Sequence, residues 1–312
     1  MSKSLKEKLS LEEVLKEFLF DCKLRKLSER TMKSYKNNNL SFFRYIETEY
    51  ELTEVNEVSY KVIQAYVYYL AEKGLKESYI NGLIKCFRAY FAYCVNERYI
   101  IENPVDRVKS QKQPINLINT FNDIEVKDMI RYYNGSRFLD MRNKFILILL
   151  FDSGIRNSEL CNLKLSDVRT TYINVLGKGK KVRHVPITLA INKYLLKYLR
   201  VREHYIKDKM GYDTEYLFLS QKGKILTVET VERIILESGS ACNVRDEIRI
   251  SPHTARHYYA QTQLKNGCDL YTLSRLLGHS KIDVTKIYLQ SMESETTVEI
   301  GAKTSPLNAL AI

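Results

Sequence analysis

The chain has 312 residues, of which 45% are hydrophobic and 28% charged, with a formal net charge of +12 and a pI near 9.2. This length allows two domains with separate cores, and the composition is that of a soluble globular protein. The longest apolar run, 145–151, is far shorter than the ~20 residues that span a bilayer, and the N-terminus has no apolar segment of a secretory signal. We therefore expect a cytoplasmic protein, without a membrane segment, whose partner is a polyanion such as nucleic acid.

The cysteines are scattered and include no Cys-x-x-Cys pair. This spacing favours reduced, mostly buried thiols over disulfides or a zinc site. No compact set of Asp and Glu residues suggests a two-magnesium site either. We expect neither a metal nor a cofactor. The six cysteines are Cys22, Cys86, Cys94, Cys161, Cys242 and Cys268.

The first hundred residues predict a bundle of four amphipathic helices. Apolar residues repeat at helical spacing over 11–25, from about 29 to 46, over 60–72 and over 77–96. Ser10 and Glu13 form a capping-box pattern before the first helix. Residues 1–114 carry a net charge of +4, which leaves +8 for the remainder. On the polar face of the fourth helix, Lys85 and Arg88 are either a solvated surface or contacts to DNA phosphates.

A polar, pattern-free stretch follows the Asn103-Pro104 junction and predicts an interdomain linker. We place the helical domain at 1–108, the linker at 109–118, a second domain at 119–290 and a tail at 291–312. Within the linker, Lys109 and Lys112 would suit a strap that runs along a DNA backbone.

The second domain predicts helices around a short hairpin. Residues 145–151 are apolar on all sides, which indicates a central core helix within 139–152. Strands at 171–176 and 182–187 flank a Gly-Lys-Gly-Lys-Lys turn at 177–181. Asp283 is expected to cap a short helix that carries Tyr288. The other helices are expected at 122–134, from 157, and at 189–208, 227–238, 253–266 and 269–277, the last ending at Gly278.

Chemistry-bearing residues occur in a particular order in this domain. Each has an ordinary explanation when taken alone, such as a surface arginine, a solvated loop lysine, a core histidine or a packed tyrosine. Together they indicate a phosphate site, since guanidinium and imidazole groups hold a phosphodiester and a nearby phenol can attack it. The order is Gly-Ile-Arg156, the turn with Lys178, His253-x-x-Arg256-His257, Leu-Gly-His279 and finally Tyr288.

These residues resemble the signature of the tyrosine recombinase (phage integrase) family. The chain has an expected residue type at all six signature positions, and the resemblance covers about 118 to 290. The N-terminal helices are similar to the core-binding domain of that family. The resemblance implies a mainly α fold with a small antiparallel β-sheet. It comprises an N-terminal four-helix, SAM-like core-binding domain and a catalytic domain, which together form a C-shaped clamp on DNA. The additional arm-binding domain of some phage integrases is expected to be absent.

The resemblance also assigns roles to the signature residues. Arg156 and Arg256 would clamp the non-bridging oxygens of the scissile phosphate, as bidentate, permanently charged groups do. Tyr288 would be the nucleophile, with His253 as its general base or as a helper that orients the phosphate. Lys178 would protonate the departing 5′-oxygen.

Two histidines and one glutamate complete this expected site. His279 would donate a hydrogen bond to the phosphate. Glu159 and His257 would either orient Arg156 and Arg256 or have a purely structural role.

The expected reaction joins Tyr288 to a DNA 3′-phosphate and frees a 5′-hydroxyl, so that resealing needs no ATP. The family likeness implies four protomers on two double-stranded DNA sites, a Holliday junction and two active protomers at a time. Without DNA the protein would be monomeric or weakly associated. The apolar tail end would dock into a neighbouring protomer, with a disordered or cis-packed tail as the alternative. Its apolar residues are Leu307, Leu310 and Ile312.

Other functions remain open at this point. A type IB topoisomerase would use the same chemistry, and a DNA-binding regulator could keep the fold without catalysis. Among recombinases, the richness in Lys, Asn, Ile and Tyr favours integration, excision or resolution of a mobile element. Xer-like resolution of chromosome or plasmid dimers is the alternative.

Overall fold

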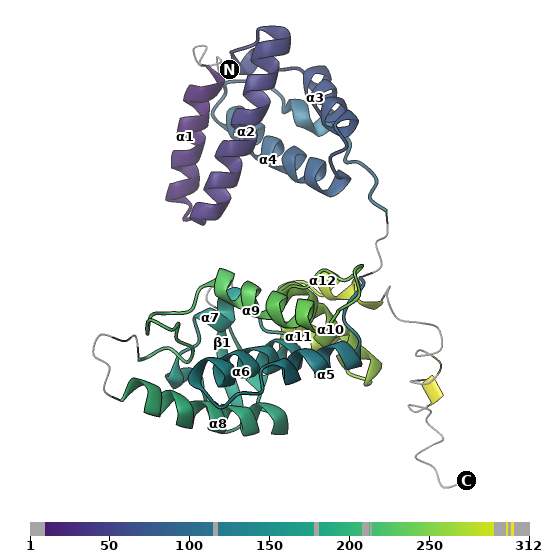
Figure 1. The fold of residues 1–312 in the computed structure, drawn as a ribbon. Coiled ribbons are helices and arrows are strands. Elements are labelled where there is room, and N and C mark those ends of the chain that lie inside the picture. The colour runs from purple at the N-terminus through teal and green to yellow at the C-terminus, as the bar shows by residue number, and fades with distance from the viewer. Residues whose placement is uncertain are drawn as a thin grey trace. The chain divides into compact units, whose positions relative to one another are not determined.

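A computed structural model of the chain describes residues 10–114, 118–177, 181–207, 212, 214–289, 298 and 301–302 (Figure 1). The chain divides into two compact units, 1–115 and 116–312. The predicted fold class is confirmed, because the described residues are mainly helical with one two-stranded antiparallel sheet. None of the helices in this part of the chain has the length and apolar composition needed to cross a bilayer. The clamp on DNA stays a prediction.

The first unit is a bundle of helices around an aromatic core. Phe42, Tyr66 and Phe87 pack ring against ring at its centre. The expected capping box is present, since Glu13 N donates to Ser10 Oγ (3.2 Å) and Ser10 N donates to Glu13 Oε2 (3.0 Å). The helices are α1 (Leu11–Leu24), α2 (Glu29–Tyr50), α3 (Tyr60–Glu72) and α4 (Glu77–Asn96), with short 3-10 turns η1 (Val55–Glu57) and η2 (Pro104–Arg107).

The polar face of α4 is partly covered by the segment that follows η2. Asn81 donates to Gln111 O (2.9 Å) and accepts from Gln111 N (2.8 Å), and Arg88 Nη2 donates to Val108 O (3.5 Å). Asn81 is accordingly only 7% exposed, although it lies on the same polar face as Lys85 and Arg88. A side-chain amide has this role because it can pair with a main-chain N–H and C=O simultaneously.

The second unit is built around α6, whose residues 145–151 are buried on every side as the sequence predicts. α6 packs against α5, α8 and α10. The elements are α5 (Asp123–Tyr132), α6 (Phe138–Ser153), α7 (Asn157–Cys161), η3 (Leu165–Asp167), β1 (Tyr172–Leu176), β2 (Val182–Pro186), α8 (Leu189–Ile206), α9 (Val228–Ala241), α10 (Pro252–Lys265), α11 (Leu270–Leu277) and α12 (Asp283–Lys286).

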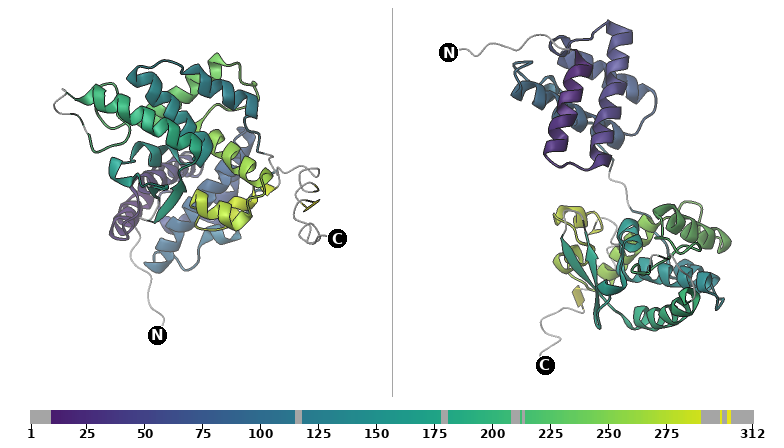
Figure 2. Two further views of the ribbon diagram at one scale, coloured as in Figure 1. Left: turned by 90° about the horizontal axis from the view of Figure 1, so that it is seen from below. Right: turned by 90° about the vertical axis from the view of Figure 1, so that its left-hand side faces the viewer.

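The sheet consists of β1 and β2, with Asn174 opposite His184. Its inward side carries Ile173 and Val175 from β1, and Arg183 and Val185 from β2, all of which are buried. β2 lies beside α11, as the right-hand view of Figure 2 shows. An arginine thus occupies an inward position of the hairpin.

The connection from α11 to Tyr288 differs from the prediction at Asp283 and at Tyr288. Gly278 ends α11 with φ +65°, as expected for a glycine C-cap. Asp283 does not cap α12, because Ile282 before it already has helical angles (φ −63°, ψ −27°) and no extended capping residue is present. Asp283 instead pairs with Lys286 Nζ at 2.8 Å. Tyr288 therefore lies two residues beyond α12 rather than on it.

Candidate active site

Five of the six signature residues are described, and they come from four segments of the second unit. Arg156 is the N-cap residue of α7, His253 and Arg256 lie on α10, His279 follows α11, and Tyr288 follows α12. The sixth, Lys178 of the hairpin turn, lies outside the described residues.

Arg256 is a buried cation held by main-chain carbonyls. Its side chain is 3% exposed and donates from Nη1 to Gly154 O (2.5 Å) and from Nη2 to Leu277 O (2.7 Å). Burial, together with the neighbouring Arg156, lowers the pKa of Arg256 to about 10, so the group is still charged at neutral pH. The carbonyls orient the guanidinium but do not neutralise it, and its charge remains able to attract an anion.

Arg156 is held by Glu159 but reaches the surface. Its Nη1 donates to Glu159 Oε1 (2.8 Å), its main-chain N donates to Glu159 Oε2 (2.9 Å), and Nη2 donates to Gly278 O (3.3 Å). The side chain is 37% exposed, whereas that of Glu159 is 5% exposed. Burial raises the pKa of Glu159, but hydrogen bonds from Arg183 and Arg156 outweigh this effect and lower it overall.

His279 bridges Arg256 and α12. Its Nε2 lies 3.0 Å from Arg256 Nη2, and its Nδ1 lies 2.7 Å from Thr285 Oγ1. A guanidinium only donates, so Nε2 accepts and the ring proton is on Nδ1. Burial and the charge of Arg256 lower the pKa of His279 to about 4. In this arrangement the ring is neutral, and donation from Nε2 to a phosphate requires the other tautomer or the imidazolium.

The phenol of Tyr288 points to His257. Tyr288 is 2% exposed and packs among apolar residues of α10 and α11, while its hydroxyl lies 3.1 Å from His257 Nδ1. Burial raises the pKa of Tyr288, and the charges of Arg256 and Arg156 offset part of that increase. Burial, His253 and Arg256 lower the pKa of His257 to about 4. A neutral imidazole thus lies beside the phenol.

His253 is one helical turn from His257, and the two rings meet edge to face, with their centroids 4.3 Å apart and their planes at 67°. Burial of the ring, followed by Arg256, Arg249 and Arg156, lowers the pKa of His253. The sequence predicts His253 as the general base or as a helper that orients the phosphate, whereas the histidine within hydrogen-bond distance of the Tyr288 hydroxyl is His257. This packing of α10 against the α12 segment could not be read from the residue order.

A pocket of about 660 Å³ opens at the site, between the hairpin and the end of α11. No acidic side chain occurs among the described residues that line it. We refer to it as the basic pocket, and its charged or titratable lining residues are Arg156, Lys181, Arg183, His184, Arg275 and His279. Such a lining suits a phosphate backbone. Sequence analysis did not single out Lys181, Arg183, His184 or Arg275.

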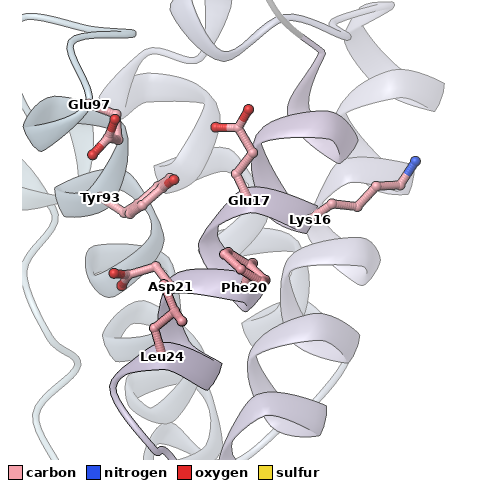
Figure 3. Close-up of a pocket in the computed structure, with 7 residues that line it drawn as sticks. All are labelled: Lys16, Glu17, Phe20, Asp21, Leu24, Tyr93 and Glu97. Carbon is pink, nitrogen blue, oxygen red and sulfur yellow. The ribbon is translucent and has the colours of Figure 1, made fainter.

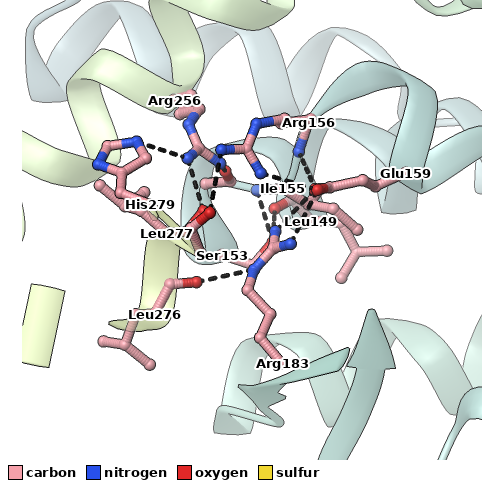
Figure 4. Close-up of polar contacts among 12 residues, drawn as sticks. Leu149, Ser153, Ile155, Arg156, Glu159, Arg183, Arg256, Leu276, Leu277 and His279 are labelled. Carbon is pink, nitrogen blue, oxygen red and sulfur yellow. Dashed lines mark hydrogen bonds and ion pairs between the residues drawn. The ribbon is translucent and has the colours of Figure 1, made fainter. Parts of the chain in front are cut away.

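Arg183, one of the residues that line the basic pocket, links Glu159 to the end of α11 (Figure 4). It donates from Nη1 and Nη2 to Glu159 Oε1 (2.9 Å) and Oε2 (2.8 Å), and from Nε to Leu276 O (2.9 Å). The signal that could have revealed it is the alternation along β2, since Arg183 shares the inward side with Val185. In the described part of the chain, no three His, Cys, Asp or Glu side chains are grouped so that they could hold a metal ion.

The predicted DNA contacts in the first unit are not equivalent. Lys85, Lys109 and Lys112 are exposed. Arg88 is partly engaged, with Nε 3.6 Å from Asp106 Oδ1 in addition to its bond to Val108 O. Their contact with DNA stays a prediction.

A second hollow, of about 530 Å³, lies between α1 and α4 of the first unit (Figure 3). Phe20 and Leu24 are exposed there. The hollow is lined by Lys16, Glu17, Phe20, Asp21, Leu24, Tyr93 and Glu97, and we call it the acidic hollow. Its three carboxylates disfavour phosphate, which distinguishes it from the basic pocket.

Comparison with known proteins identifies the chain. Residues 120–295 match the phage integrase family, and residues 10–112 match the phage integrase SAM-like domain. The chain belongs to this family. It is 32% identical over 295 residues to tyrosine recombinase XerC of Thermodesulfovibrio yellowstonii, covering 93% of this chain and 95% of the relative. Tyrosine recombinase XerD of Staphylococcus aureus is 29% identical over 289 residues, covering 91% and 96%.

Among solved structures, the XerH site-specific recombinase bound to palindromic difH substrate aligns with a TM-score of 0.73 at 20% identity. The alignment covers 96% of this chain and 84% of XerH. The chain is therefore a tyrosine recombinase of the Xer type, an enzyme that cleaves and rejoins DNA. The expected family and enzyme class are confirmed.

Proposed function

We propose that this recombinase cleaves each DNA strand by attack of Tyr288 on a phosphate held by Arg156 and Arg256. The observation that carries the proposal is the placement of the Tyr288 phenol beside His257 and close enough to both arginines for their charges to lower its pKa. Two guanidinium groups can bind the two non-bridging oxygens and stabilise the additional charge of the pentavalent transition state. The phenol supplies the nucleophile at the same place.

In the proposed step, Tyr288 Oη forms a bond to phosphorus and the bond from phosphorus to the 5′-oxygen breaks. The phenolic proton passes to His257, which lies 3.1 Å away. The 5′-oxygen receives a proton from Lys178, and His253 and His279 contact the phosphate. The products are a 3′-phosphotyrosyl bond and a free 5′-hydroxyl, so the energy of the phosphodiester is kept for resealing.

Bound phosphate also explains how histidines with low pKa values would take part. Burial is the main cause of the low pKa values of His257 and His279, and neighbouring positive charge lowers them further. The negative charge of the phosphate would offset the contribution of the arginines. Protonation of His279 then becomes easier, and its Nε2 can donate to the phosphate oxygen. DNA binding would in this way activate the site.

For the product, we favour resolution of chromosome or plasmid dimers, since two Xer recombinases match more than nine tenths of the chain. Integration or excision of a mobile element remains the second candidate, on the composition alone. The two-site reaction would use a tetramer and a Holliday junction. Docking of the tail between protomers stays a proposal, because Leu307, Leu310 and Ile312 lie outside the described residues.

The test is covalent trapping on DNA. The binding site is first located by footprinting on DNA flanking the gene and by selecting genomic fragments that the protein retains. A nicked duplex of that site, whose cleavage releases a short fragment and prevents resealing, should accumulate a covalent adduct with the wild-type protein. Tyr288→Phe should form none, whereas Tyr271→Phe, at a tyrosine that is 65% exposed, should react like the wild type.

Two outcomes would contradict the proposal. An adduct with Tyr288→Phe would show that another residue is the nucleophile. The absence of an adduct with wild-type protein that binds the site would remove the cleavage reaction itself. A plasmid with two sites then distinguishes the products, since recombination changes the order of the DNA whereas a topoisomerase only relaxes it.

A further inference from the structure

Arg183 is a buried charge at the meeting point of the hairpin, α7 and the end of α11. It is 9% exposed, and its three nitrogen atoms are all engaged: two with the Glu159 carboxylate and one with the Leu276 carbonyl. A buried guanidinium with this geometry is strongly oriented, because losing one bond would leave a charged group without its partner. Through Glu159, through Leu276 and through its own strand, Arg183 is connected to three parts of the site.

The first contact leads to Arg156. Glu159 uses Oε1 for Arg183 Nη1 and Arg156 Nη1, and Oε2 for Arg183 Nη2 and the Arg156 main-chain N. One carboxylate therefore holds both arginines. Arg183 is the more buried of the two, with 9% of its side chain exposed against 37% for Arg156. Arg183 thus holds the Glu159 carboxylate on its buried side, and Arg156 binds the same carboxylate on the side nearer the surface.

The second contact leads to His279 and Arg256. Leu276 is in the last turn of α11, and the two following carbonyls, of Leu277 and Gly278, accept from Arg256 and Arg156. A Cβ at Gly278 would lie 2.8 Å from Arg183 Cδ, so the arginine stem passes directly against this turn. The position of Arg183 therefore fixes the segment from which His279 emerges.

The third connection is covalent, because Arg183 is itself part of the hairpin. It belongs to β2, and Gly177 at the base of the turn lies close to it: a Cβ there would be 4.0 Å from Arg183 Nη1 and 3.7 Å from Glu159 Oε1. Lys178 follows Gly177 in the chain. Arg183 thus links the base of the hairpin to the Glu159 carboxylate.

We propose that Arg183 is a positioning residue for cleavage, which aligns Arg156 and His279 around one phosphate. This inference rests on the proposed cleavage by Tyr288 and adds a residue that acts through its protein partners, because all three of its nitrogen atoms are bonded to protein oxygens. Arg183 acts through geometry: its planar fork spans the carboxylate and, through Nε, the carbonyl on the opposite side. A lysine ammonium is a single point charge and cannot span both.

The test compares Arg183→Lys and Arg183→Gln with a matched control, Arg142→Lys. Arg142 is also a buried arginine of the second unit, 5% exposed, and donates to a main-chain carbonyl, Leu219 O (2.8 Å), away from the site. Single-turnover cleavage of the nicked duplex is measured at saturating DNA, together with the dissociation constant for that duplex and the thermal unfolding midpoint.

For Arg183→Lys we expect cleavage to slow by about 100-fold, the effect of misplacing reacting groups by about 1 Å. The dissociation constant should change by less than about threefold, since most DNA affinity comes from other phosphate contacts. Arg142→Lys should lower the unfolding midpoint to a similar degree but cleave at the wild-type rate. If Arg183 were merely structural, Arg183→Lys would slow cleavage no more than Arg142→Lys does at a similar loss of stability.

The proposal is overturned if folded Arg183→Lys and Arg183→Gln cleave as fast as the wild type, or if Arg142→Lys slows cleavage equally. Should neither Arg183 variant fold, Glu159→Gln reports on the same bridge, and wild-type cleavage by that variant overturns the proposal as well. Failure of the underlying cleavage reaction is distinguishable, because the wild-type protein would then form no adduct at all.

Discussion

Protonation is unfavourable at three histidines of the site: His253, His257 and His279. Burial is the first cause at each, followed at His257 by His253 and Arg256 and at His279 by Arg256 and Arg156. A folded protein with such groups resists taking up protons that the unfolded chain accepts. The protonation of these histidines is therefore coupled to the stability of the second unit.

The free energy of unfolding should therefore fall as pH decreases from about 6.5, the pKa of an unfolded histidine, toward the value of about 4 for His257 and His279. Between pH 7 and pH 5 we expect a loss of about 1 kcal/mol for each of these two histidines, after allowance for partial solvent screening. Urea unfolding followed by circular dichroism measures it. A His257→Asn, His279→Asn double variant should lose most of this pH dependence, and an unchanged dependence would show that other groups cause it.

At the scale of elements, three of the proposed catalytic residues lie at segment ends, whereas Arg256 and His257 lie within α10. Arg156 precedes α7, His279 follows α11 and Tyr288 follows α12. The sharp end of α11 at Gly278 permits this, since a left-handed residue there brings the Gly278 carbonyl to Arg156 and the turn against Arg183. Any other residue at position 278 would be destabilised for two reasons: φ is positive, and its Cβ would lie too close to the Arg183 side chain.

Gly278→Ala and Gly267→Ala separate these two effects. Both glycines have positive φ, +65° and +89°, but only a Cβ at Gly278 meets a neighbour, Arg183 Cδ at 2.8 Å. Each variant should lose about 1 kcal/mol of unfolding free energy from backbone strain. Only Gly278→Ala should also slow single-turnover cleavage. Equal cleavage by the two variants would argue against contact between this turn and the Arg183 bridge.

At the scale of the whole molecule, positive charge is divided between the two units. The second unit has the basic pocket, and the first has Lys109 and Lys112 exposed on a segment that the Asn81–Gln111 amide pair holds against α4. The acidic hollow lies elsewhere on the first unit, between α1 and α4. This distribution favours DNA contact through the segment after η2 rather than through the acidic hollow.

Salt dependence of DNA binding tests this distribution. If both lysines contact phosphates, a Lys109→Ala, Lys112→Ala double variant should reduce the slope of log K against log salt concentration by about 2. Lys16→Ala is the control, because Lys16 lines the acidic hollow with Glu17 and Asp21 and should leave the slope unchanged. An unaltered slope in the double variant would remove the segment from the DNA interface.

Much of this organisation could be predicted from the sequence, because helical periodicity and glycine positions are local signals. The apolar run 145–151 gave the core helix, and Gly278 gave the end of α11. Contacts between distant segments could not be predicted in this way. The bond from His257 to Tyr288 and the sharing of Glu159 by two arginines depend on tertiary packing. Arg183 was discernible in principle, from its alternation with Val185, but only once the inward side of β2 was known.

The most direct measurement on the central claim is the chemical identity of the protein–DNA bond. The trapped adduct is digested with protease and nuclease, and the modified peptide is sequenced by mass spectrometry. We predict one nucleotide attached through its 3′-phosphate to Tyr288, with a 5′-hydroxyl on the released strand. Attachment to a different residue, or a 5′-phosphate linkage on Tyr288, would contradict this account.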